Sequence, residues 1–157
     1  MIQIRNAVRT DTEALLDLLH AIGWFAWINE ATPERALERV RQQLELALAD
    51  DSHTIYIAHT DGRQVVGYLA VHWLPYLILA GPEGFVSELF VREEARGQGV
   101  GGQLLRRVTD EARQRGCARL SLLTMQERES YRRGFYRQHG WDERPDARNF
   151  ILRLTRP

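Results

Sequence analysis

The sequence has only one cysteine, Cys117, in 157 residues, which excludes an internal disulfide. Scarce cysteine is typical of a reducing compartment, and we expect a cytoplasmic protein. No apolar run reaches the roughly 20 residues that a membrane-spanning helix requires. The opening residues, Met-Ile-Gln-Ile-Arg, also lack the basic and then apolar pattern of a signal segment. We therefore expect no membrane partner.

An excess of charge of either sign is also missing, because 21 basic residues balance 21 acidic ones. This balance argues against a nucleic-acid partner, since such proteins usually carry a strong positive charge. The sequence shows no repeats, low-complexity segments or linkers. Its length therefore predicts one domain over residues 1–157.

The histidines show no metal-binding pattern. An HExxH motif and paired metal spacing are absent, and Cys117 has no cysteine partner, so we expect no metal. We interpret the histidines as surface or strand residues, and the alternative is that one of them joins a proton relay. The five are His20, His53, His59, His72 and His139.

Glycine, in contrast, is concentrated in one place. Four of the twelve glycines fall between Gly97 and Gly102. They follow an apolar strand predicted over residues 85–91 and precede a predicted helix. Glycines permit positive φ and a close approach of the backbone, so main-chain N–H groups can converge here on an anion at a helix start. The apolar face of that helix consists of Val100, Leu104, Leu105, Val108 and Ala112.

Three other interpretations fit parts of this pattern. Gly97-x-Gly99-x-x-Gly102 matches a dinucleotide fingerprint, but that motif follows its strand directly and has an acidic residue at the end of the next strand. Here a charged segment intervenes, and the next predicted strand, residues 120–124, ends without an acid. A P-loop requires Gly-Lys-Ser/Thr, and this chain has Gly-Gly-Gln. The third interpretation is a glycine-rich helix start that binds nothing.

Arg96-x-x-Gly99-x-Gly101, preceded by Glu-Leu-x-Val from Glu88 to Val91, resembles the acyl-CoA signature of the GNAT superfamily of N-acyltransferases. The resemblance extends over essentially the whole chain. It implies an α/β fold with a mixed, mostly antiparallel sheet, splayed central strands and flanking helices.

The order of the predicted elements is similar to this fold. Apolar periodicity, helix caps and the Asp61-Gly62 turn signal define the elements. The parallel βαβ unit is expected around the glycine turn. In order, the sequence predicts a strand at 2–7, a helix from 10 to 23, a connection at 24–27, a helix from 32, strands at 53–59, 65–73 and 85–91, a helix from 100, a strand at 120–124, a short helix at 130–139 and two terminal strands within 141–154.

The resemblance also implies acetyl-CoA as the cosubstrate. The backbone of Leu89, Phe90 and Val91 would pair with the amides of its pantetheine arm, as an added strand pairs with a sheet edge. The family often has an asparagine and a small residue where this chain has Glu129 and Arg132, which weakens the expectation of arm contacts there. The diphosphate would be held by residues 96–102, here named the glycine segment: Arg96, Gly97, Gln98, Gly99, Val100, Gly101 and Gly102.

Acyl transfer from a thioester requires that the amine lose a proton and that the leaving thiolate receive one. Tyr136, in Gly134-Phe-Tyr136-Arg-Gln-His-Gly140-Trp, matches the segment where the family places its general acid. Proton transfer from tyrosine to a thiolate is uphill by only about 2 kcal/mol. Glu88 is the candidate base, directly or through a water, and a backbone N–H within residues 88–90 would meet the oxyanion. The alternatives are a packing tyrosine and an edge-strand carboxylate.

The prediction of the acceptor site rests on weaker signals in the sequence. In this fold the first two helices and their connection usually form its wall. Trp24, Phe25 and Trp27, with Glu30 nearby, would suit an ammonium through cation–π and charge attraction. Trp73 would face the same side. The alternative is that these aromatics pack against the core or a partner subunit.

The sequence therefore predicts an N-acetyltransferase that moves an acetyl group from acetyl-CoA to a primary amine of a small molecule. The amine would attack directly in a ternary complex. One alternative is a protein N-terminal or lysine acetyltransferase, and another is a non-catalytic acyl-CoA-binding sensor domain. A homodimer is expected from the family alone.

Overall fold

A computed structural model describes residues 1–154, which fall into two compact units. The first unit is Met1–Leu123 and the second begins at Thr124. A single acetyltransferase domain over the whole chain stays a prediction.

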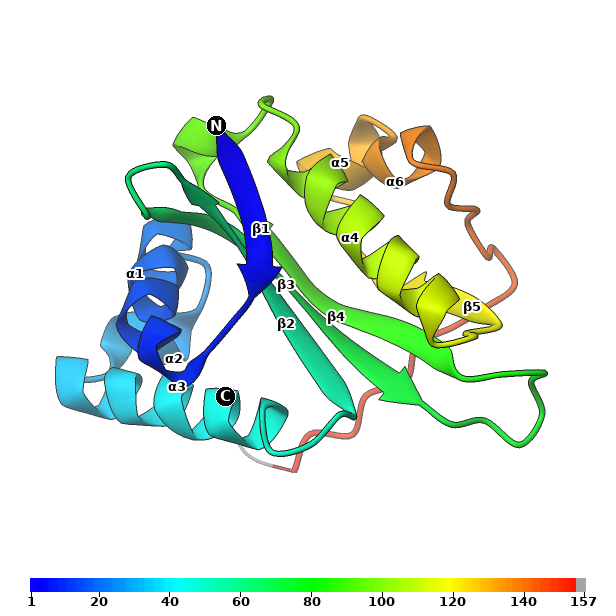
Figure 1. The fold of residues 1–157 in the computed structure, drawn as a ribbon, viewed down its shortest axis with the longest axis horizontal. Coiled ribbons are helices and arrows are strands. Elements are labelled where there is room, and N and C mark those ends of the chain that lie inside the picture. Colours follow the sequence, from blue (N-terminus) through cyan, green and yellow to red (C-terminus); the bar gives the residue numbers. More distant parts are fainter. Residues whose placement is uncertain (155–157) are drawn as a thin grey trace. The chain divides into compact units, whose positions relative to one another are not determined.

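The first unit contains one five-stranded sheet with the order β1-β2-β3-β4-β5 (Figure 1). Neighbouring strands from β1 to β4 are antiparallel, and β5 runs parallel to β4. This confirms the mixed, mostly antiparallel sheet with one parallel pair. The strands are β1 (Ile2–Asn6), β2 (His53–Thr60), β3 (Val65–Leu74), β4 (Glu83–Val91) and β5 (Arg119–Leu122).

Helices flank both faces of this sheet. Three of them cover one face and α4 covers the other (Figure 1). Two 3-10 turns, Arg9–Asp11 and Glu93–Ala95, precede α1 and the glycine segment. The helices are α1 (Thr12–Ile22), α2 (Ala26–Glu30), α3 (Pro33–Ala47) and α4 (Val100–Gln114).

Local signals set the ends of α1 and α3. Gly23 ends α1 with a φ of 70°, and its N–H donates to the Leu19 carbonyl at 3.1 Å. Glycine adopts this left-handed conformation without the penalty of a Cβ. Thr32 caps α3 by accepting a hydrogen bond from the Arg35 N–H, and Pro33 occupies the first helical position. Between these ends the chain forms α2, where the sequence predicts only a connection.

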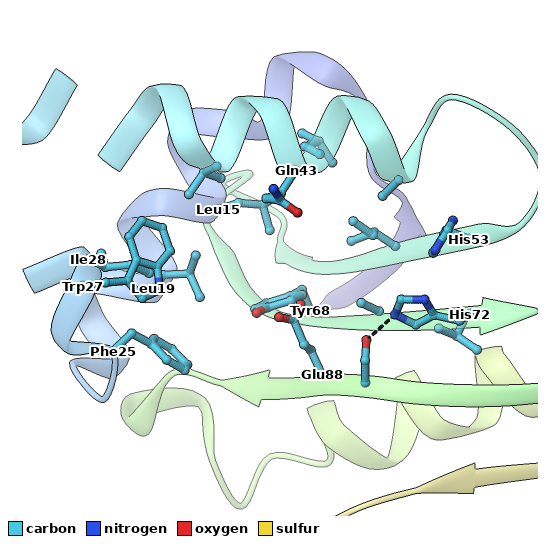
Figure 2. Close-up of a pocket in the computed structure, with 17 residues that line it drawn as sticks. Leu15, Leu19, Phe25, Trp27, Ile28, Gln43, His53, Tyr68, His72 and Glu88 are labelled. Atoms are coloured by element: carbon cyan, nitrogen blue, oxygen red, sulfur yellow. Dashed lines mark hydrogen bonds between the residues drawn. The ribbon is translucent and has the colours of Figure 1, made fainter. Parts of the chain in front are cut away.

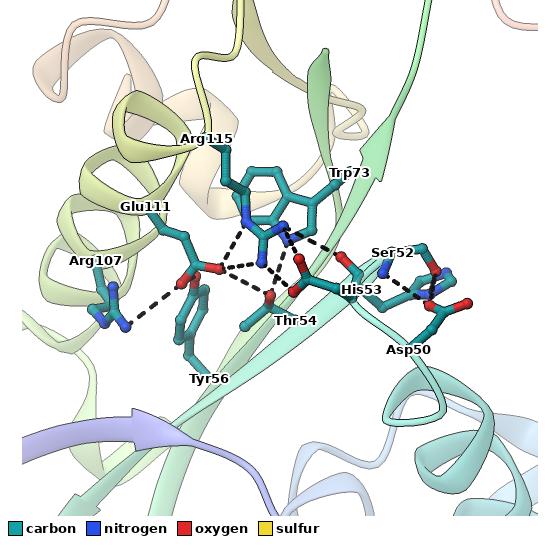
Figure 3. A network of polar contacts seen from close by, with 10 residues as sticks. Asp50, Ser52, His53, Thr54, Tyr56, Trp73, Arg107, Glu111 and Arg115 are labelled. Carbon is teal, nitrogen blue, oxygen red and sulfur yellow. Dashed lines mark hydrogen bonds and ion pairs between the residues drawn. The ribbon is translucent and has the colours of Figure 1, made fainter.

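α4 packs through a continuous apolar face and one polar anchor. Glu111 accepts hydrogen bonds from the hydroxyls of Thr54 at 3.2 Å and Tyr56 at 2.5 Å on β2 (Figure 3). Arg115 donates to Glu111 and lies 4.6 Å from the centroid of the Trp73 ring. These contacts fix α4 to β2 and β3. The residues that the periodicity assigns to the apolar face are all buried: Val100, Leu104, Leu105, Val108 and Ala112.

The connection between β3 and β4 passes very close to the turn after α4, at Gly81. A Cβ on Gly81 would lie 2.4 Å from the carbonyl oxygen of Gly116, a backbone atom that cannot rotate aside. We expect Gly81→Ala to destabilise the fold by about 1–3 kcal/mol, the usual cost of overpacking. The midpoint of urea unfolding measures this loss. The control is Gly62→Ala, whose Cβ would meet only the Thr60 hydroxyl at 3.7 Å, and equal midpoints would contradict the close approach.

The second unit contains two four-residue helices, α5 (Glu129–Arg132) and α6 (Phe135–Gln138). The sequence predicts one helix here, but Gly134 interrupts it with a φ of 68°. The two strands predicted within residues 141–154 are wrong, because these residues form no strand. Phe150 and Leu152 alternate as strand residues do, yet both are largely exposed, so no buried face holds them in a sheet.

Within residues 1–154, no helix is both long and apolar enough to cross a bilayer. The same residues contain no group of three or more His, Cys, Asp or Glu side chains arranged to hold a metal ion.

Candidate active site

The site begins where the sheet divides between β4 and β5. Parallel pairing joins these strands only from Glu83, opposite Arg119, to Val86, opposite Leu122. β4 then continues to Val91, paired with β3 but no longer with β5. The splayed central strands that the resemblance implies are therefore present. Over residues 87–91, the β5-facing edge of β4 takes no part in the sheet pairing of the described chain.

The glycine segment leads from β4 into the start of α4. Gly97 and Gly99 have φ values of 74° and 78°, and a Cβ at either position would meet no heavy atom within 4 Å. Both positions favour glycine, and open space lies in front of them. The Gly99 carbonyl accepts the first helical hydrogen bond, from the Gln103 N–H at 3.0 Å. The N–H groups of the first turn, from Val100 onward, have no partner within the helix and suit an anion.

Arg96 connects the glycine segment to the end of β4. Its Nε donates to the Val91 carbonyl at 3.3 Å, and its guanidinium carbon lies 5.7 Å from the centroid of the Trp24 ring. Trp24 packs edge-to-face on Phe90, with centroids 5.9 Å apart. Arg96 thus holds the turn against the strand whose edge is open.

β4 carries a β-bulge at Ser87, which turns two consecutive side chains to one face. Ala70 of β3 lies opposite Glu88, and Val71 lies opposite Val86, so Ser87 is the extra residue. In a regular strand Ser87 and Glu88 would point to opposite faces. The bulge allows both to line the same cavity.

This cavity lies between the sheet and the helices α1 to α3, within the first unit, and has a volume of about 280 Å³ (Figure 2). Its wall is mostly apolar, and none of the residues described as lining it is Lys or Arg. The polar or titratable residues of the wall are Gln43, His53, Tyr68, His72, Ser87 and Glu88.

Glu88 is the only carboxylate among these lining residues, and it lies beside Tyr68 (Figure 2). Glu88 is exposed at the mouth of the cavity, but the protein atoms around its carboxyl group displace enough water to raise its pKa, and a hydrogen bond from the Tyr68 hydroxyl offsets only part of that rise. Burial and the charge of Glu88 also raise the pKa of Tyr68, so this hydroxyl stays protonated. A carboxylate with a raised pKa accepts a proton more readily, which supports the prediction for Glu88 without testing it.

Only part of the aromatic wall expected from the sequence lines the cavity. Phe25 and Trp27 line the cavity. Trp24 lies outside its lining and packs toward β4 instead. Glu30, at the end of α2, is also outside the lining.

Trp73 belongs to the other face of the sheet. Its Nε1–H donates to the Thr54 hydroxyl at 2.9 Å, and its ring packs against Arg115 near α4. Strand alternation explains this placement, because the preceding residue, His72, lines the cavity and the next side chain points away from it. Trp73 therefore forms no part of this cavity.

Tyr136 lies in α6 of the second unit. Its ring packs edge-to-face with Phe135 and Trp141, at centroid distances of 5.1 and 6.5 Å. Burial raises the pKa of Tyr136, and hydrogen bonds with Ser130 and Thr124 offset part of the rise. The hydroxyl is therefore protonated at neutral pH, as a general acid must be. Its role in catalysis stays a prediction.

Reasoning from the sequence left open that one histidine joins a proton relay, but it did not bring two histidines together at the polar end of the cavity. His53 and His72 line it with ring centroids 4.5 Å apart, and the Nε2 of His72 lies 2.9 Å from the Ser87 hydroxyl. One histidine on each strand of a predicted hairpin is a signal for such a pair. That signal becomes specific only when the register of β2 and β3 is known.

The sequence matches the family model described as the Acetyltransferase (GNAT) family over residues 19–141, well over half of the chain. The chain belongs to this family. GNAT proteins are acyl-CoA-dependent N-acetyltransferases, in agreement with the signature in the glycine segment.

The sequence identity to individual proteins is low, 31% or less in the three examples that follow. The chain is 31% identical over 64 residues to the thialysine N-ε-acetyltransferase of Bos taurus, and this alignment covers 41% of the chain but only 37% of that protein. It is 28% identical over 142 residues to the aminoalkylphosphonate N-acetyltransferase of Salmonella typhimurium, covering 90% of the chain and 85% of the relative. The solved structure of a transcriptional regulator from Bacillus halodurans aligns with a TM-score of 0.81 at 24% identity, over 98% of this chain and 100% of that one. This last likeness concerns the fold alone.

Proposed function

We propose that this GNAT chain transfers an acetyl group from acetyl-CoA to a primary amine of a small molecule, by direct attack in a ternary complex. One arrangement carries the proposal. β4 has an open main-chain edge at residues 87–91, leads into the glycine segment and directs Glu88 into a largely apolar cavity. In this proposal the donor site and the acceptor site would lie along the same strand.

The donor site fits the chemistry of acyl-CoA. The edge of β4 at Leu89, Phe90 and Val91 offers main-chain groups that would pair with the pantetheine amides. The N–H groups of the glycine segment would hold the diphosphate, since two of its residues adopt positive φ and face open space. Acetyl-CoA would supply the activated acetyl thioester at this edge.

Residues of the chain would then stabilise the charges that form during the reaction and transfer its protons. Glu88 would attract the ammonium group in the cavity, and an N–H of residues 88–90 would stabilise the tetrahedral oxyanion. Tyr136 would protonate the leaving thiolate, a role that rests on its motif and on its protonated state.

The cavity supports a small acceptor with an apolar body. Its volume of about 280 Å³ is close to the lower end of small-ligand sites, roughly 300–1,000 Å³. A protein N-terminus or lysine would need an open groove instead. The names of the two relatives, thialysine and aminoalkylphosphonate acetyltransferases, also point to small amines. Without Lys or Arg in the described lining, an uncharged body suits this cavity better than a phosphonate. A cytoplasmic location and a homodimer remain predictions.

Thiol release from acetyl-CoA over a panel of amines tests this proposal. The chain contains no lysine, so the signal cannot come from acetylation of its own lysine side chains. We expect turnover of arylalkyl and alkyl amines, and much slower turnover of an aminoalkylphosphonate and of a lysine-containing peptide. Turnover of the peptide alone would favour a protein acceptor. Binding of CoA without turnover of any amine would favour a sensor domain and contradict the proposal.

A further inference from the structure

Two histidines form the polar end of the acceptor cavity. His53 on β2 and His72 on β3 are directly opposite in the antiparallel register. Their rings meet edge-to-face, with centroids 4.5 Å apart and an interplanar angle of 73°. Both line the cavity that also contains Glu88 (Figure 2).

His72 is linked to the strand that carries Glu88. Its Nε2 lies 2.9 Å from the hydroxyl of Ser87, the bulge residue that immediately precedes Glu88. Burial lowers the pKa of His72, and the neighbouring charge of His53 lowers it further. His72 is therefore a neutral imidazole near pH 7 and can accept a proton.

His53 is linked to the surface. Its Nδ1 lies 2.7 Å from the Ser52 hydroxyl, which donates its own proton to Asp50 Oδ1 at 2.5 Å (Figure 3). The N–H of Ser52 donates to the same carboxylate oxygen at 2.8 Å. Because the single hydroxyl proton of Ser52 is given to Asp50, the bond to His53 must use the proton of Nδ1. Asp50 is exposed, and its bonds to Ser52 hold its pKa below the usual range.

Few other charges face this pair. Glu88 on β4 and Tyr68 on β3 are the remaining titratable groups of the cavity wall. The lining residues of α3 are Val40, Gln43, Leu44 and Ala47, none of which is titratable, and those of α1 and α2 are apolar or aromatic. The carboxylates around this pair are thus Glu88 in the cavity wall and Asp50, which is joined to His53 through Ser52.

We propose that His72, with His53 packed against it, accepts the proton that the acceptor amine loses, and that the pair releases this proton to solvent at the end of the cavity where Ser52 and Asp50 lie. This deepens the proposed acetyl transfer and rests on it. The N–H bond of the ammonium breaks, its electron pair stays on nitrogen for attack on the thioester, and a new N–H bond forms on the imidazole of His72. Imidazole, with a reference pKa of about 6.5, lies closer to an amine at about 10.4 than a carboxylate at about 4.3 does. Glu88 then serves to attract the ammonium group.

The pH dependence of His72→Gln tests this route, measured as kcat/KM for an accepted amine by thiol release. In the wild-type protein, kcat/KM should fall as the pH drops through the pKa of His72, which burial holds below its usual value, because a protonated His72 cannot accept another proton. We expect His72→Gln to lower kcat/KM by about 100-fold at pH 7, the low end of the general-base effect, because Glu88 remains. The loss should shrink toward pH 10, where the amine deprotonates without help.

Two further variants separate this role from a structural one. Asp50→Asn removes the carboxylate at the surface end of the route, so it should lower kcat/KM at pH 7, and this loss should also shrink toward pH 10. His59→Gln, on the same strand but outside the cavity lining, should leave rate and profile unchanged. An active wild type whose His72→Gln variant loses the same factor at every pH, or loses nothing, would overturn the relay alone. A wild type that turns over no amine would overturn acetyl transfer and the relay together.

Discussion

Tyr136→Phe is expected to lower kcat for acetyl transfer by at least about 100-fold, within the range of a lost general acid. The substitution removes one oxygen and keeps the ring that packs against Phe135 and Trp141. Because Tyr136 is assigned to the leaving thiolate and not to binding, the Kd for CoA should not change. Single-turnover thiol release and a CoA titration measure the two quantities separately.

Tyr131→Phe is the matched control in the same unit. The Tyr131 hydroxyl is exposed and donates to Glu143 at 3.0 Å, away from any role in the proposed chemistry. It should keep wild-type kcat. If both phenylalanine variants retained activity, Tyr136 would be a packing residue and the thiolate would take its proton from elsewhere.

Gly99→Asp is expected to weaken CoA binding by about 100-fold or more, whereas Gly99→Asn should weaken it far less. Asn and Asp tolerate the left-handed backbone of this position better than other side chains, and they have nearly the same size. They differ in one negative charge. At about 5 Å from a diphosphate charge and an effective dielectric of 20, that charge costs about 3 kcal/mol. Calorimetric titration with CoA gives both affinities.

The comparison between the two variants excludes a folding defect. A Cβ at Gly99 would meet no protein atom within 4 Å, so both variants should unfold at similar denaturant concentrations. Equal CoA affinities for the Asp and Asn variants would mean that no anion lies near this N–H group.

The predictions that succeeded depend on local signals. Gly23 and the Thr32-Pro33 pair mark helix ends through their own backbone preferences, and both act as expected. The apolar face of α4 follows from periodicity, because a helix of 15 residues repeats its pattern several times. The turn in the glycine segment could also be predicted from the sequence, since Gly97 and Gly99 occur where positive φ is required.

The predictions that failed depend on surroundings. Residues 141–154 alternate like strands, but no neighbouring strand pairs with them in the described chain. Trp73 has the size of a substrate-binding aromatic, yet the alternation of β3 sends it to the face of α4. Composition alone cannot tell the two faces of a strand apart when both are covered by helices.

The histidine pair shows how register limits prediction. A two-residue loop at Asp61-Gly62 would place Ala70 opposite His53. The loop instead includes Arg63, with a φ of 62°, and a bulge follows between Ala58 and His59. These irregularities shift the register so that His72 faces His53.

A crystal structure of the protein with CoA tests the central claim most directly, which is that main-chain N–H groups of the glycine segment bind the diphosphate. The account predicts diphosphate oxygens within about 3.2 Å of the N–H groups of residues 99–102, with the pantetheine arm along the open edge of β4. CoA bound elsewhere, with the glycine segment empty, would contradict it.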